Sequence, residues 1–70
     1  MLMFDFDRLR RLRKQRYMTQ QEAGALLGYS AATIGRYERG DVEIPVAELV
    51  RIANVYGDKN VQNFFVERIG

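Results

Sequence analysis

The sequence has no cysteine, no histidine and no tryptophan, and it has a single proline. Without cysteine there are no disulfides or thiolate ligands, and without histidine the usual metal sites are excluded, so we expect neither a metal nor a cofactor. No apolar run approaches the roughly 18 residues of a membrane span. The opening MLMFDFD is acidic where a secretory signal is basic, so we expect a cytoplasmic protein with no membrane partner.

The remaining composition is that of a small folded domain. The chain has 70 residues, of which 47% are hydrophobic and 29% are charged, which suits one core and leaves no room for a second. The net charge is only +2, but residues 8 to 39 hold eight Arg or Lys and two Glu, while both flanking segments are acidic. The middle of the chain can therefore face an anion, although a run such as RLRRLRKQR usually forms a solvated helix face.

Helical spacing and capping residues divide the chain into about five short helices, and we expect a compact all-α bundle. The first helix is expected from about Asp7 to Gln15. The second follows Thr19, which is placed to form a capping box with Glu22, and Gly28 suits the left-handed turn at its end.

The second half of the chain continues this alternation of caps and helices. Ser30 is placed to cap a third helix that ends at Gly40, and Pro45 suits the first turn of a fourth. Asn60 can cap a final helix over about residues 60–69. Two interpretations of that helix stay open: its apolar residues form a dimer interface, or they cover the core of the same subunit; these residues are Phe64, Phe65 and Ile69.

Residues 19–40, TQQEAGALLGYSAATIGRYERG, combine several features in one register. These are a Thr-Gln-x-Glu opening, a small residue at Gly24, a turn glycine followed by serine, and a final Glu-Arg-Gly after Ile34 and Tyr37. The pattern resembles the helix-turn-helix family of phage repressors, Cro proteins and regulators of the xenobiotic-response-element type. The resemblance covers about residues 9–56. It implies a lambda-repressor-like helix-turn-helix within a single domain, residues 1–70.

The resemblance implies binding to double-stranded DNA, with the second helix of the motif in the major groove and the first crossing the phosphate backbone. The positions that match base-reading residues are Ser30, Ala31, Ala32, Gly35 and Arg36. The positions that match backbone contacts are Thr19, Gln20, Tyr29, Thr33 and Arg39. The resemblance also implies a structural ion pair between Arg13 and Glu38; the alternative is that both side chains are exposed.

The positions that match base-reading residues carry few side-chain functional groups. Alanine methyl groups can pack against thymine methyls, and the planar fork of Arg36 matches the O6 and N7 acceptors of guanine. Arg36 is therefore the expected principal reader, and the alternative is a helix that has lost base reading. Two departures from the family's pattern stand out: the link after the third helix is acidic at Asp41 and Glu43, and the bulky Tyr17 stands where relatives often have glycine or asparagine.

These features favour a sequence-specific transcriptional regulator, expected to be a repressor that binds a palindromic operator as a homodimer. One alternative is a protein-interaction adaptor or antitoxin-like module that keeps the fold but reads DNA weakly or not at all. Another is that the basic first helix binds RNA or an anionic membrane surface. An enzyme is not expected, because the chain lacks a phosphate loop and a convincing pair of catalytic carboxylates, and no small-molecule ligand is evident.

Overall fold

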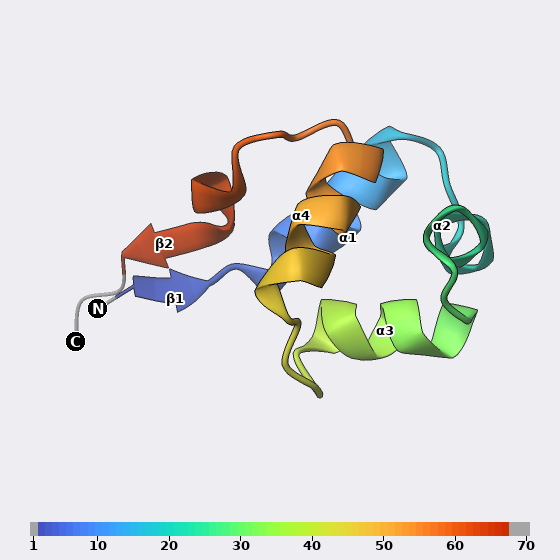
Figure 1. Ribbon diagram of the computed structural model, residues 1–70, viewed down its shortest axis with the longest axis horizontal. Helices are drawn as coiled ribbons and strands as arrows, with labels where there is room; N and C mark the ends of the chain where they lie inside the picture. Colours follow the sequence, from blue (N-terminus) through green and yellow to red (C-terminus); the bar gives the residue numbers. More distant parts are fainter. Residues whose placement is uncertain (1, 68–70) are drawn as a thin grey trace.

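The computed structural model describes residues 2–67. The elements follow in the order β1 (Leu2–Phe4), α1 (Phe6–Gln15), α2 (Gln20–Leu27), α3 (Ala31–Arg39), α4 (Val46–Val55), the 3₁₀ turn η1 (Val61–Phe64) and β2 (Phe65–Glu67). In Figure 1, α3 lies along one side of the molecule, and the β1–β2 ribbon lies at the opposite end from α2. The domain is thus mostly helical, with one small sheet.

The capping residues define α2 and α3 as predicted. The backbone N–H of Glu22 donates to the Thr19 hydroxyl at 3.0 Å, and the backbone N–H of Thr19 donates to the Glu22 carboxylate at 2.9 Å. Gly28 ends α2 with φ of 82°, a left-handed conformation that glycine adopts without strain. The Ser30 hydroxyl then accepts from the backbone N–H of Thr33, so α3 begins only a few residues after α2 ends.

The core lies between the inner faces of the four helices and η1. Tyr56 and Phe64 are among its largest fully buried side chains, which lie at the end of α4 and in η1. All four helices contribute, because each has an apolar stripe at helical spacing. The buried apolar residues are Leu9, Ala23, Leu27, Ile34, Leu49, Ile52, Ala53, Tyr56 and Phe64.

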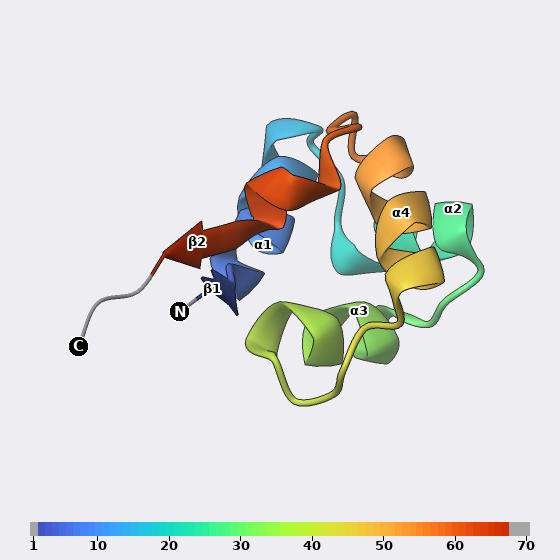
Figure 2. The same ribbon diagram turned by 60° about the vertical axis from the view of Figure 1, so that its left-hand side comes forward.

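The expected fifth helix over about residues 60–69 is wrong as far as residue 67, the last described residue, and so is the expectation of an all-α bundle; the rest of that helix lies outside the described residues. Residues 61–64 form one 3₁₀ turn, and residues 65–67 form a strand that pairs antiparallel with residues 2–4, with Met3 opposite Val66. Both Figure 1 and Figure 2 show the two strands side by side. Aromatic and β-branched residues such as those of Phe65–Glu67 favour a strand when a partner strand is available.

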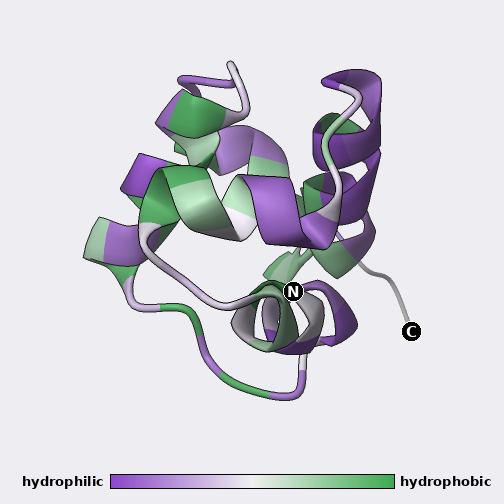
Figure 3. Cartoon of the chain, turned by 90° about the vertical axis from the view of Figure 1, so that its right-hand side faces the viewer, coloured by the Kyte–Doolittle hydropathy of each residue, from purple (hydrophilic) through white to green (hydrophobic). Residues whose placement is uncertain are grey.

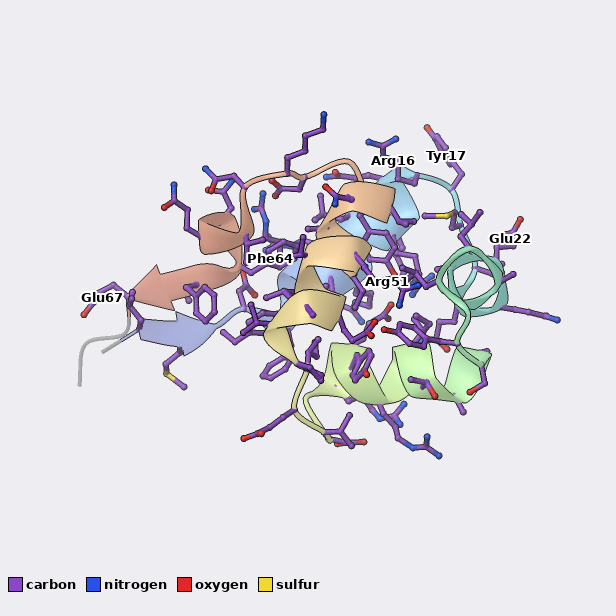
Figure 4. The ribbon with its side chains drawn as sticks, in the orientation of Figure 1. Arg16, Tyr17, Glu22, Arg51, Phe64 and Glu67 are labelled. Carbon is purple, nitrogen blue, oxygen red and sulfur yellow. The ribbon has the colours of Figure 1, made fainter. Side chains whose placement is uncertain are left out.

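The start of α1 differs by one residue from the sequence expectation, and its end at Gln15 is as predicted. The helix begins at Phe6 with Asp5 as its N-cap, so Asp7 lies inside the first turn, where a carboxylate favours the helix dipole. At the other end, Tyr17 has φ of 57°, the left-handed conformation that glycine or asparagine adopts more easily. Its side chain projects away from the body, whereas Phe64 points into it (Figure 4).

Candidate nucleic-acid interface

Gly24 brings the turn between α2 and α3 against α2. A Cβ atom at this position would lie 2.4 Å from the carbonyl oxygen of Tyr29, so only glycine leaves room for that backbone. The backbone N–H of Tyr29 donates to the carbonyl of Gly24 at 2.8 Å, which fixes the start of the turn. Figure 3 shows the result: α2 is seen lengthwise while α3 is seen nearly end-on, so the two helices cross steeply.

A buried ion pair fixes the other end of α3. Arg13 of α1 donates to both carboxylate oxygens of Glu38, from Nε at 2.6 Å and from Nη2 at 3.0 Å. The two side chains are only 8% and 5% exposed. Hydrogen bonding to Glu38 raises the pKa of Arg13, so the guanidinium stays charged. Arg13 also donates to the carbonyl of Met18, and the Gln20 amide donates to Glu38 at 3.3 Å, so α1, the start of α2 and the end of α3 form one unit.

The predicted base-reading residues do not all lie on the open surface. Ala32 and Arg36 are exposed on the outer side of α3, and Ala31 is half-buried. The Ser30 hydroxyl is exposed but caps α3, and it lies 3.1 Å from the half-buried hydroxyl of Thr33. The open part of the face therefore carries Ala32 and Arg36, with Ser30 at its N-terminal end.

Gly35 is buried, which corrects its expected place on the open face. A Cβ atom there would lie 3.1 Å from Nη1 of Arg39 and 3.5 Å from the side-chain amide of Gln20. The side chains of Arg39 and Gln20 therefore converge over Gly35, which leaves space for them. A helical wheel gives the direction of each residue but not which longer side chains fold across it.

The expected phosphate contacts begin at the N-terminus of α2. Thr19 is exposed and Gln20 is half-buried, beside the free backbone N–H groups of the first turn. Arg39 is exposed, and its Nε donates to the Asp41 carboxylate at 2.9 Å. Thr19, Gln20 and Arg39 thus remain candidates for contact with the DNA backbone.

Tyr29 has a different setting from the one expected of a phosphate contact. Its hydroxyl donates to Glu48 of α4, and its ring meets Tyr37 edge-on. Burial, together with the hydrogen bond to Glu48, raises the pKa of Tyr29 to about 12, so the hydroxyl stays protonated. Arg51 completes the cluster by donating to Glu48 at 2.6 Å and to the carbonyl of Leu27 at 2.7 Å. The spacing of Glu48 and Arg51 along one helix was the only sequence signal for this cluster.

The basic run of α1 is largely occupied by ion pairs within the domain. Its partners are acidic residues from three places in the chain: Arg8 pairs with Asp58, Arg10 with Asp7, and Arg11 with Asp5. On the outer side of α3 the guanidinium of Arg36 has no ion-pair or hydrogen-bond partner within residues 2–67. Arg36 is therefore the cation of this face that is available to an anion or a base edge.

The turn at Gly24 is tight, the buried Arg13–Glu38 pair holds α3, and the outer face of α3 is open. This arrangement of α2 and α3 is a helix-turn-helix. A family model described as a helix-turn-helix domain matches residues 7–58. The chain therefore belongs to the helix-turn-helix domain family, a class of DNA-binding domains whose second helix lies in the major groove. A search of curated proteins and a search of solved structures each gave no match.

Two further features are absent from the described residues, 2–67. No helix in this range is both long enough and apolar enough to cross a membrane. The same range contains no group of three or more His, Cys, Asp or Glu side chains that could hold a metal ion.

Proposed function

We propose that this domain is a sequence-specific transcriptional regulator of the phage repressor and Cro type, and that it acts as a repressor by occupying a palindromic operator as a dimer. One observation carries the proposal: α3 is held by the buried Arg13–Glu38 pair, while Arg36 on its outer face has no ion-pair or hydrogen-bond partner among residues 2–67. A preorganised helix with a free guanidinium suits base reading, because the backbone is already ordered and no internal ion pair has to be broken.

In the proposed complex, Arg36 donates two hydrogen bonds to guanine, and Ala32 packs against a thymine methyl group. Thr19, Gln20 and Arg39 contact phosphates, and the N-terminus of α2 adds its positive helix end. Arg36 supplies about 1–3 kcal/mol of discrimination at one base pair, so much of the remaining specificity comes from methyl contacts and DNA shape.

The proposed dimer interface has to be revised from the sequence expectation. Phe64 is fully buried in its own core, which excludes it from an interface, and Ile69 lies outside the described residues. Phe65 is 42% exposed and borders a mostly apolar surface pocket of about 240 Å³, lined by Phe4, Phe6, Glu43, Ile44, Val46, Leu49 and Phe65. The exposed side chains of Leu2 and Met3 lie on the neighbouring strand. This apolar surface supports dimer formation through the ribbon end of the domain.

The test is selection of bound sequences from a random duplex library. The intact protein, Arg36→Ala and the matched control Arg10→Ala are compared, because Arg10 is an exposed arginine whose partner, Asp7, lies on the same helix. We expect a paired motif from the intact protein and the control, and a relaxed guanine preference from Arg36→Ala. No enrichment by the intact protein, with duplex binding only at low salt, would contradict operator reading and favour a protein-interaction adaptor.

The dimer is tested separately by sedimentation equilibrium of the intact protein and of Phe65→Gln. A concentration-dependent dimer that the substitution weakens is the expected result. A monomer at all concentrations, both free and bound to a single half-site, would contradict the proposed interface.

A further inference from the structure

Asp41 lies at the edge of the candidate interface, and its carboxylate is bonded to Arg39, one of the expected phosphate contacts. We propose that Asp41 is a positioning residue that competes with DNA phosphate for Arg39 and so lowers the sequence-independent part of the affinity. This inference rests on the proposed function. It adds to the base contacts of Arg36 a determinant of overall DNA affinity, one that acts by limiting backbone binding.

The end of α3 places Asp41 beside Arg39. Gly40 is left-handed with φ of 74°, its backbone N–H donates to the carbonyl of Tyr37, and the backbone N–H of Asp41 donates to the carbonyl of Arg36 at 3.0 Å. These two bonds form the Schellman arrangement that ends a helix at glycine. The chain reversal turns the Asp41 side chain back toward the last turn of α3, where it meets Nε of Arg39 at 2.9 Å.

Arg39 lies at the meeting point of the expected backbone contacts. Its Nη1 atom and the Gln20 amide both lie near Gly35, 3.1 Å and 3.5 Å from where a Cβ atom would be. Gln20 begins α2, whose unpaired N–H groups favour an anion. A phosphate bound at this point would therefore accept from Arg39 and from the α2 N-terminus together, with Asp41 as the competing anion.

The competition is balanced because the Arg39–Asp41 pair is exposed. The two side chains are 63% and 52% exposed, and exposed ion pairs contribute little to stability because water solvates both partners. A phosphate can thus displace Asp41 at small cost, but each binding event must break this pair and bring the DNA close to its negative charge. The cost is independent of base sequence, so it weakens binding to all duplexes alike.

The experiment compares Asp41→Asn with Glu43→Gln, which removes the same charge two residues further along without an Arg39 contact. Binding to a duplex of arbitrary sequence is measured over a range of salt concentrations. We expect Asp41→Asn to bind about two- to fivefold more tightly for each bound copy. We also expect its slope of log K against log salt to steepen by up to about 0.9, the value for one added phosphate contact.

Arg39→Gln provides the decisive background. If Asp41 acts through Arg39, the gain from Asp41→Asn falls in Asp41→Asn/Arg39→Gln to about the size of the gain from Glu43→Gln, which itself persists unchanged in Glu43→Gln/Arg39→Gln. Equal gains from Asp41→Asn and Glu43→Gln in the intact background, or a gain from Asp41→Asn that is undiminished without Arg39, would overturn the inference but leave DNA binding intact. Absence of duplex binding by the intact protein and by Asp41→Asn at the lowest salt would overturn the proposed function as well.

Discussion

The helices α1 and α3 both carry several arginines but use them differently. In α1, the residues Arg8, Arg10, Arg11 and Arg13 each pair with a carboxylate of the same chain, and the pairs of Arg8 and Arg13 link the helix to other parts of the fold. In α3, Arg39 pairs with Asp41, and the guanidinium of Arg36 has no such partner within residues 2–67. The longest basic run in the sequence is thus mainly structural, and the candidate interface has far fewer charges.

This contrast shows that the number of charges in a segment is a poor guide to its partner. What matters is whether acidic side chains elsewhere in the fold reach those charges. Such pairing is invisible in the sequence where the partners are distant, as with Arg8 and Asp58, which lie 50 positions apart. Each prediction below tests one side of the contrast.

Glu38→Gln breaks the link between the two helices and should have the largest effect. It leaves the charge of Arg13 buried without its partner, which costs about 3–5 kcal/mol of the free energy of unfolding. Because a domain of this size has roughly 5 kcal/mol in total, the variant should be largely unfolded. Urea unfolding followed by circular dichroism measures the loss; a loss below about 1 kcal/mol, the range of an exposed pair, would contradict the buried role.

Tyr17→Asn tests the strained end of α1. Left-handed φ costs a bulky residue roughly 1–2 kcal/mol, and asparagine adopts it more easily. The side chain of Tyr17 is 93% exposed, so its removal should sacrifice little packing. We expect the free energy of unfolding to rise by about 1 kcal/mol in the same assay. Tyr17→Ala is the matched control, since it removes the ring without relieving the backbone.

Gly35→Ala tests the position in α3 where a side chain is missing beneath Arg39 and Gln20. Glycine inside a helix costs about 0.5–1 kcal/mol relative to alanine, and the atom nearest to the new methyl group is the flexible end of Arg39. We therefore expect the free energy of unfolding, measured by thermal unfolding, to rise by about 0.5–1 kcal/mol. Gly24→Ala is the contrasting case, because its methyl group would meet backbone; destabilisation by Gly35→Ala as well would mean that Arg39 cannot move aside.

Arg10→Ala should have the smallest effect. The Arg10–Asp7 pair is exposed and its atoms are 3.6 Å apart, so we expect the free energy of unfolding to change by less than about 0.5 kcal/mol. Guanine preference should also be unchanged in the library selection. A change in guanine preference comparable to that of Arg36→Ala would mean that α1 contacts DNA. It would contradict the view that the arginines of α1 are mainly structural.

The sequence predicted the features that follow from local rules. The capping box at Thr19 and the left-handed Gly28 each depend on one residue and its near neighbours, and the structure has both. The left-handed Tyr17 lies where the resemblance, and not a local rule, indicated glycine or asparagine. The partnership of Arg13 and Glu38 came from a resemblance, because their 25-residue separation gives no local signal.

The errors share a cause in long-range contacts. The chain after residue 60 has apolar spacing compatible with a helix, but pairing of β2 with β1 across more than 60 positions determines its form. Likewise, the resemblance placed Gly35 among the base-reading positions, and only the folded positions of Arg39 and Gln20 reveal that it is covered. The bond from the Tyr29 hydroxyl to Glu48 of α4 is another long-range contact without a signal at Tyr29 itself.

The pairing of β1 with β2 has a consequence for the order of synthesis. The helix-turn-helix is complete when residue 40 has left the ribosome, but β1 has no partner strand until residues 65–67 follow. Phe64, which stacks on Phe4 with ring centroids 5.8 Å apart, fills the core only at that stage. A nascent chain halted before residue 64 would carry every proposed DNA contact on an incomplete core, so full stability is delayed until residues 64–67 have emerged.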